Sequence, residues 1–129
     1  MSTIFSKIID GSIPCYKVAE NEQFLAFLDI LPLVKGHVLV IPKVEVDFIF
    51  DLDDTILSAM MVFAKEVALK MKKVLPCKKI GVTVIGLEVP HAHIHLIPIN
   101  GLADMDFSKA KLTLPTSEME SICSLILNA

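Results

Sequence analysis

The sequence has few of the features that mark membrane, secreted or nucleic-acid-binding proteins. Its longest nearly unbroken apolar stretch, Ile56–Ala64, is far shorter than the roughly 18–20 residues of a membrane-spanning helix. The N-terminal segment carries charged side chains and no long apolar block, so we expect no cleaved signal peptide. The formal charge is -3, whereas a general nucleic-acid binder normally carries a basic field. We therefore expect neither a membrane nor a nucleic acid as a partner.

Cysteines and charged residues are also scarce. Cys15, Cys77 and Cys123 are odd in number, widely spaced and form no C-x-x-C pair. This pattern predicts reduced, mostly buried thiols and a cytoplasmic location. Charged residues make up only 21% of the chain, whereas 53% is hydrophobic and the mean hydropathy is +0.64. The excess of apolar side chains favours an oligomer that covers part of the surface.

The first half of the chain predicts a short helix and three strands. Ser2 can cap a helix over Thr3–Ile9, which Asp10-Gly11 then ends. Three apolar runs with strand character follow: Cys15–Ala19, Phe24–Asp29 and His37–Ile41. Their connections are too short for a parallel crossover, so we expect antiparallel neighbours.

The second half predicts a long helix, two strands and a final helix. Apolar residues recur at three- and four-residue steps over Asp53–Lys73. Ile80–Ile85 and His91–Ile99 have strand character, and Gly101–Lys111 is expected to be a loop. The pair Ser117-x-x-Glu120 predicts a capping box for the last helix.

This order of elements indicates an α+β fold. We expect an antiparallel meander sheet of about five strands, one long central helix, and short helices near the two ends. The length of 129 residues suits one domain with an ordinary core, and the sequence shows no repeat or linker. We therefore expect one domain over residues 1–129.

Three of the four histidines alternate along one predicted strand. Because side chains two residues apart on a strand share a face, His91, His93 and His95 should point the same way, about 6.6–7 Å apart. The residues between them should point into the core. The fourth histidine, His37, begins another predicted strand directly after Gly36.

The residue types alone leave three interpretations of these histidines open. The first is a purely structural role. The second is a zinc site, since zinc accepts three imidazoles and a water molecule. The third is a metal-free phosphate site in which one imidazole is the nucleophile and its neighbours are donors. A neutral imidazole is nucleophilic near pH 7, and crowding three rings disfavours charging them together.

Four segments resemble the histidine triad (HIT) superfamily. His91–Pro98 is similar to the His-x-His-x-His-x-x signature of that family, and three further segments match in order and spacing: Ile4–Ile9, Ala26–Pro32 and Gly36–Lys43. The nearest branch is the Hint-like nucleoside phosphoramidases. The resemblance implies a HIT-like fold, usually paired into a homodimer. It also implies a hydrolase of purine nucleoside 5′-phosphates with an amine, sulfate or phosphate leaving group.

The same resemblance implies roles for the four histidines. His93 would attack the α-phosphorus and carry a transient nucleotidyl group. His91 would orient His93 through its main-chain carbonyl group. His95 would contact the phosphate and help protonate the leaving group, and a histidine at this place favours transfer to water. His37 would support the surroundings of the nucleophile.

The resemblance also implies a nucleotide-binding set. Asp29 would accept hydrogen bonds from both ribose hydroxyl groups, which a short carboxylate can do bidentately. Phe5, Ile8 and Ile30 would form the apolar walls that sandwich the base, the alternative being plain core.

The family uses no metal in catalysis, so the resemblance implies a reaction without a metal or other cofactor. Some relatives hold a structural zinc ion through a Cys-x-x-Cys near the first helix. Thr3 and Ser6 occupy that region here, and Glu45 follows shortly after Pro42. We therefore expect no such zinc site.

Departures from the family pattern concern the choice of substrate. Leu87 and Glu88 stand where relatives often have Gln-Ser, and the serine often contacts the phosphate or leaving group. A carboxylate there would repel a phosphate or bind a cationic amine. A phosphate-contacting Asn of the family aligns with Ile80 or, if a loop is shortened, with Thr83. A dinucleoside polyphosphate hydrolase and a nucleotide-binding regulatory module with little turnover remain alternatives.

Overall fold

The computed structural model describes residues 3–129 of the chain, so the predicted cap Ser2 lies outside the described residues. The first helix, α1 (Ile4–Ile9), begins after Thr3, whose hydroxyl accepts a hydrogen bond from the Ser6 N–H group. The helix therefore starts one residue later than predicted, because a Thr hydroxyl can satisfy a free N–H group of the first turn. Asp10 ends the helix as predicted.

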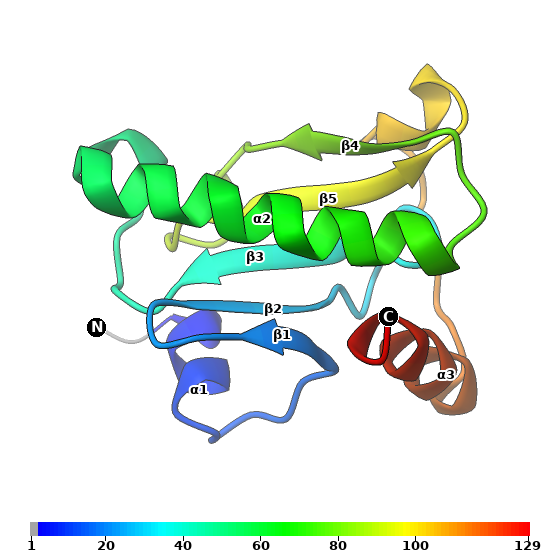
Figure 1. Cartoon of the computed structure of the whole chain (residues 1–129), viewed down its shortest axis with the longest axis horizontal. Helices are drawn as coiled ribbons and strands as arrows, with labels where there is room; N and C mark the ends of the chain where they lie inside the picture. Colours follow the sequence, from blue (N-terminus) through cyan, green and yellow to red (C-terminus); the bar gives the residue numbers. More distant parts are fainter. Residues whose placement is uncertain (1–2) are drawn as a thin grey trace.

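Five antiparallel strands form one sheet (Figure 1). The strands are β1 (Lys17–Glu20), β2 (Phe24–Leu28), β3 (Val38–Pro42), β4 (Lys79–Thr83) and β5 (Ile94–Ile99). The first three form a meander, β5 pairs with β3, and β4 pairs with β5. The order across the sheet is β1-β2-β3-β5-β4, so β1 and β4 are the edges. The predicted α+β fold is confirmed.

The long helix α2 (Asp54–Val74) lies across one face of this sheet (Figure 1). It begins after Asp53, whose carboxylate accepts the Ile56 N–H at 2.8 Å. Met60 and Met71 are fully buried on its sheet side, as expected of core filler. No helix within residues 3–129 is long and apolar enough to cross a membrane.

The last helix, α3 (Thr116–Leu127), packs at the β1 end of the sheet, and its predicted capping box is wrong. The helix begins directly after Pro115, with no side-chain cap. The fixed backbone angle of proline suits a helix start, so the chain enters the helix early and Ser117 already lies in its first turn. Neither Ser117 nor Glu120 caps the helix, and Glu118 of the first turn forms an ion pair with Lys35 at 2.6 Å.

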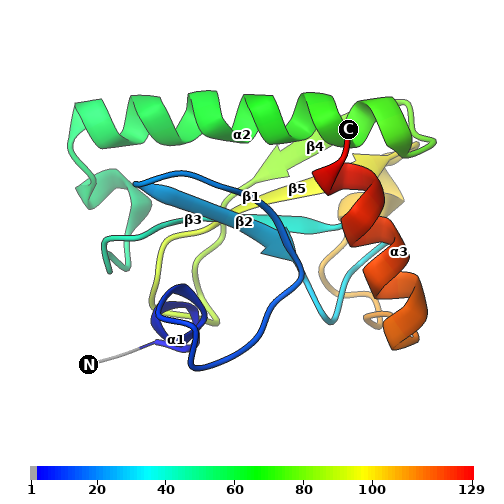
Figure 2. The same ribbon diagram turned by 60° about the horizontal axis from the view of Figure 1, so that its bottom comes forward.

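Both faces of the sheet are buried, each in its own apolar cluster. Phe24 and Leu28 of β2 belong to the cluster on the side of α2. Leu25 and Phe27, which alternate with them, pack with Phe5 of α1 on the other side. Figure 2 shows α1 on the side of the sheet opposite α2. The side that carries α1 is the one that also carries the histidines.

The loop Gly101–Lys111 and the three cysteines differ from the predictions. The expected loop Gly101–Lys111 contains a short 3-10 helix, η2 (Leu102–Met105), and another such helix, η1 (Ile49–Asp51), precedes α2. The three cysteines are free, but each is half-buried rather than mostly buried.

Candidate active site

The three alternating histidines point to the same side of the sheet, although only His95 belongs to β5. The predicted strand His91–Ile99 starts too early, because Ala92 donates its N–H to the Val46 carbonyl outside the sheet. The alternation itself is confirmed. Ala92 and Ile94 are buried on the side of α2, and the histidines face α1.

The rings lie closer together than the strand repeat predicts. The centroids of His93 and His95 are 4.9 Å apart, instead of about 6.6–7 Å. Phe5 lies edge-on to both His91 and His93, with centroids 5.7 and 5.1 Å away. The helix α1 therefore packs directly against two of the three imidazoles.

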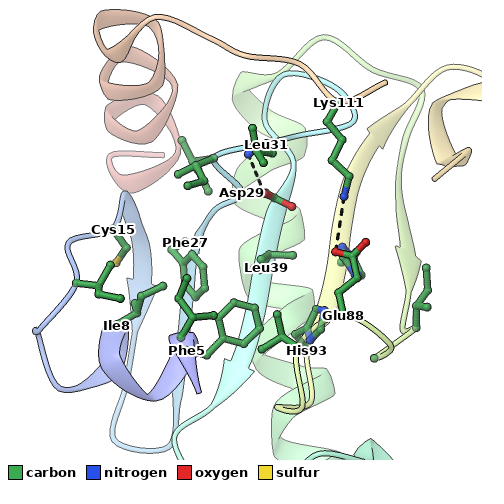
Figure 3. A pocket seen from close by; sticks show the side chains of 18 of the residues that line it. Phe5, Ile8, Cys15, Phe27, Asp29, Leu31, Leu39, Glu88, His93 and Lys111 are labelled. Atoms are coloured by element: carbon green, nitrogen blue, oxygen red, sulfur yellow. Dashed lines mark hydrogen bonds and ion pairs between the residues drawn. The ribbon is translucent and has the colours of Figure 1, made fainter. Parts of the chain in front are cut away.

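A cavity of about 430 Å³ opens beside these rings (Figure 3). His93 and His95 line it, whereas His91 and His37 lie behind them, outside the lining. Apolar side chains of α1, β2 and β3 form much of its wall, and polar groups gather at one end. The lining includes Ile4, Phe5, Ile8, Cys15, Phe27, Asp29, Ile30, Leu31, Leu39, Leu87, Glu88, Phe107 and Lys111.

The hydrogen bond of His93 fixes which of its nitrogens is bare. Nδ1 of His93 lies 2.7 Å from the main-chain carbonyl oxygen of His91. Because a carbonyl oxygen only accepts hydrogen bonds, Nδ1 must carry the hydrogen. In the neutral ring, Nε2 then holds the lone pair. This arrangement gives the cavity a potential nucleophile.

His91 is fully buried and both of its ring nitrogens bond to protein groups. Nε2 donates to the Pro42 carbonyl at 2.8 Å, so Nδ1 accepts from the Thr3 hydroxyl at 3.0 Å. Burial lowers the pKa of His91, which favours the neutral ring that this pattern requires. Since both nitrogens have protein partners, the geometry does not favour the zinc hypothesis built on His91, His93 and His95.

The residues at the expected position of a relative's structural zinc form a hydrogen-bonded cluster. The Ser6 hydroxyl donates to Glu45, and the Thr3 N–H donates to the same carboxylate oxygen at 3.3 Å. The Thr3 hydroxyl in turn donates to His91. Hydrogen bonds therefore tie the start of α1 to the histidine whose carbonyl orients His93.

A hydrogen bond joins His37 to His95, and its donor and acceptor can be assigned; this pair is called the His37–His95 relay below. The Leu33 N–H donates to His37 Nδ1 at 3.1 Å, so His37 carries its hydrogen on Nε2. That Nε2 lies 2.9 Å from Nδ1 of His95 and donates to it. His95 must then carry its own hydrogen on Nε2. The cavity thus holds a bare nitrogen of His93 beside an N–H donor of His95.

Burial keeps both rings of this relay neutral. It lowers the pKa of His37 to about 3, with a further contribution from the neighbouring His95. It lowers the pKa of His95 to about 4, with a contribution from His93. Neither ring is charged near pH 7, so the assigned hydrogen positions hold there.

A glycine sets the backbone turn that leads into His37. Gly36 has a φ angle of +88°, and a Cβ atom there would lie 2.6 Å from the Leu75 Cδ1 atom. Only glycine adopts this conformation without strain and leaves room for Leu75. The tight turn places His37 directly before β3, within hydrogen-bonding distance of His95.

Asp29 follows the end of β2 and lies at the polar end of the cavity. Its Oδ1 atom accepts the Leu31 N–H at 3.0 Å, and its Oδ2 atom lies 3.8 Å from His37 Nε2. Burial raises the pKa of Asp29. Asp29, His37 and His95 could together hold a metal ion by distance alone. In the structure, however, Nε2 of His37 and Nδ1 of His95 are hydrogen-bonded to each other at 2.9 Å.

All three residues predicted to wall the base line the cavity. Phe5 is buried, Ile8 is half-buried and Ile30 is largely exposed at the rim. Phe5 also belongs to the apolar cluster of α1. Phe5 therefore contributes to the hydrophobic core, which was the alternative interpretation, and also forms part of the cavity wall.

Ile80 and Thr83, the two residues aligned with the family's phosphate-contacting Asn, lie on opposite faces of the sheet. Thr83 pairs with His95 across β4 and β5, so both point to the cavity side of the sheet. Ile80 packs against the core on the side of α2. Thr83 is therefore the residue of the two that shares the histidine face, although it does not border the cavity.

Sequence reasoning missed two residues of the site that come from the segment after η2. Phe107 lies edge-on to His95, with ring centroids 4.9 Å apart, and also 6.3 Å from His37. Lys111 lies over the mouth of the cavity, with Nζ 3.8 Å from Glu88 Oε2 (Figure 3). No local pattern marks either residue in the sequence, because the segment reaches the site only through tertiary contacts.

Comparison with known families agrees with this geometry. A family model described as HIT domain matches residues 10–101. The chain belongs to the HIT family. The match ends before Phe107 and Lys111, so this HIT protein completes its cavity with residues outside the matched region.

Individual HIT proteins resemble the chain over most of its length. Adenosine 5′-monophosphoramidase hnt1 of Schizosaccharomyces pombe is 39% identical over 103 residues, which are 76% of this chain and 74% of that protein. A solved HIT-like protein involved in cell-cycle regulation from Bartonella henselae has a TM-score of 0.85 at 29% identity, covering 98% of this chain and 95% of that one. A hypothetical histidine triad nucleotide-binding protein from Sulfolobus tokodaii has a TM-score of 0.82 at 26% identity, covering 97% and 89%.

Proposed function

We propose that the protein is a metal-independent hydrolase of purine nucleoside phosphoramidates that acts through a nucleotidyl group on His93. The observation that carries the proposal is the Nε2 atom of His93, whose Nδ1 donates to a carbonyl, next to the N–H donor of His95 in one cavity. A lone pair beside a donor is what in-line attack on a phosphate needs. The similarity to the Schizosaccharomyces pombe monophosphoramidase supports the same reaction class.

The proposed reaction has two steps. Nε2 of His93 attacks the α-phosphorus, the phosphorus–nitrogen bond breaks, and the leaving nitrogen takes the Nε2 proton of His95 and departs as the amine. The negative charge then left on the His95 ring is balanced by the positive charge on the neighbouring nucleotidyl-His93, which keeps its Nδ1 hydrogen. A water molecule then attacks the nucleotidyl-His93, returns a proton to His95 and releases the nucleoside monophosphate. His91 holds His93 in position through its carbonyl oxygen, and His37 holds His95.

The rest of the cavity suits the nucleoside. Asp29 is proposed to accept the ribose hydroxyl groups, because it lies at the polar end with Oδ2 free of strong partners. Phe5, Ile8 and Ile30 are proposed to hold a purine between apolar surfaces. The free thiols at the three cysteines favour a reducing compartment, and a cytoplasmic location is part of this proposal.

Turnover of adenosine phosphoramidate tests the proposed function against its rivals. We expect release of AMP that a chelator does not reduce, because no proposed step needs a metal. Faster cleavage of dinucleoside polyphosphates would favour the polyphosphate hydrolase instead. Tight AMP binding without turnover would favour the regulatory module, and activity lost to a chelator and restored by zinc would favour the zinc hydrolase.

We also propose that two copies pair through the edge strand β4. Val82 of β4 is 46% exposed, and Met61 and Leu69 of the adjacent α2 are more than half exposed. An unpaired strand edge beside apolar side chains suits a second copy. We expect light scattering to give about twice 14.2 kDa. Val82→Lys should yield monomers, whereas Leu125→Lys on α3, at the other end of the sheet, should not.

A further inference from the structure

The Glu88–Lys111 pair at the mouth of the cavity has no part in the proposed two steps. The side chains reach toward each other across the opening from different segments (Figure 3). Glu88 lies in the loop before His91, and Lys111 lies in the segment after η2. Among residues 3–129, Lys111 is the one lysine that lines the cavity, and the sequence contains no arginine.

The two partners differ in how firmly they are held. The Leu112 N–H donates to the Pro32 carbonyl at 2.8 Å, and Phe107 packs against His95. These contacts fasten the segment on both sides of Lys111. The Lys111 side chain is 32% exposed, whereas that of Glu88 is 82% exposed. Glu88 can therefore turn into solvent while Lys111 stays over the cavity.

Lys111 also lies close to the groups that handle the phosphate in the proposed reaction. Burial raises the pKa of Asp29, and the Lys111 ammonium acts against that rise. Burial lowers the pKa values of His37 and His95, and the same ammonium adds to both shifts. A group that leaves the phosphorus next to His95 and projects from the cavity therefore comes near Lys111.

We propose that Lys111 is a specificity residue that recognises an anionic group, such as a carboxylate, on the leaving group of the substrate. In the free protein the Glu88 carboxylate occupies that place. A substrate carboxylate displaces Glu88, which moves into solvent, and gains a charge-assisted hydrogen bond from Lys111. An uncharged leaving group gains nothing from this exchange. The proposal rests on the proposed function, because it concerns the leaving group of that reaction.

Two AMP conjugates of similar size test this role, one linked through nitrogen to β-alanine and one to n-propylamine. They differ in the carboxylate. We expect Lys111→Gln to lower the ratio of kcat/KM for the β-alanine over the propylamine conjugate by about tenfold. Glu88→Gln should raise that ratio by about threefold, because the competing carboxylate is gone. Lys109→Gln, an exposed change on the same segment, serves as the control and should not alter it.

An unchanged ratio in Lys111→Gln overturns the proposal, and so does an equal loss for both conjugates, which would place Lys111 on the shared phosphate. A lower ratio in Glu88→Gln also overturns it. If the unaltered protein cleaves neither conjugate, the proposed function fails instead. Calorimetric affinities of the two conjugates for the same proteins then give the ratio without turnover, and lack of any difference between the conjugates overturns the Lys111 role.

Discussion

His93→Gln lowers kcat for adenosine phosphoramidate by about 10⁴-fold or more, the largest effect that we expect from a single substitution. The glutamine side chain fills much of the space of the imidazole but offers no nucleophilic nitrogen lone pair. The donor at His95 and the apolar walls remain, so some catalysis over water persists. Initial-rate measurements at saturating substrate check this expectation.

Two further measurements separate lost chemistry from lost structure in His93→Gln. The thermal midpoint should change little, because the position borders the cavity and a glutamine amide can still donate to the His91 carbonyl. AMP should bind with an affinity within about tenfold of the unaltered protein, since the proposed base and ribose contacts remain. Undiminished turnover in a folded His93→Gln protein would rule out the proposed nucleophile.

Acidification from pH 7 to pH 5 lowers the free energy of unfolding by about 2 kcal/mol for each ring of the His37–His95 relay. The pKa values are about 3 for His37 and about 4 for His95, below the 6.5 of an unfolded histidine. The unfolded chain therefore binds more protons between those values and pH 6.5. Stability is complete above pH 6.5 and falls as the pH falls through that window.

Urea unfolding at the two pH values measures this loss, and His37→Gln provides the matched comparison. Glutamine stays neutral at both pH values, so the loss on acidification should shrink by about the share of one ring. The pKa of Asp29 is raised in the folded protein, so this group stabilises the fold on acidification. Its contribution begins at its folded pKa, which lies above the ordinary carboxyl value, and partly offsets the loss from the histidines. Equal stability at pH 7 and pH 5 would contradict the neutral, buried relay.

Much of the fold follows from patterns that are local in the sequence. The 3.6-residue apolar period predicted α2 because one stripe of a helix must face the sheet. The two-residue period predicted that His93 and His95 share a face while Ile94 is buried. The capping box at Ser117 failed because Pro115, two residues earlier, already sets a helical start.

The site was less predictable, because its decisive contacts join distant residues. The hydrogen positions follow from pairs such as His37 with His95, 58 residues apart, and Thr3 with His91, 88 residues apart. Phe107 and Lys111 belong to a segment that reads as an ordinary polar loop. Only its anchoring to the loop before β3 brings them over the cavity.

The most direct test of the account is to trap the nucleotidyl group on the protein. A reaction with adenosine phosphoramidate is quenched in alkali within the first turnover, because a phosphorus–nitrogen bond to imidazole is labile in acid. Peptide mass spectrometry then locates the adduct. We predict one adenylyl group on the peptide that contains His93, and none in His93→Gln. Turnover with no adduct on His93 at any time point would contradict the account.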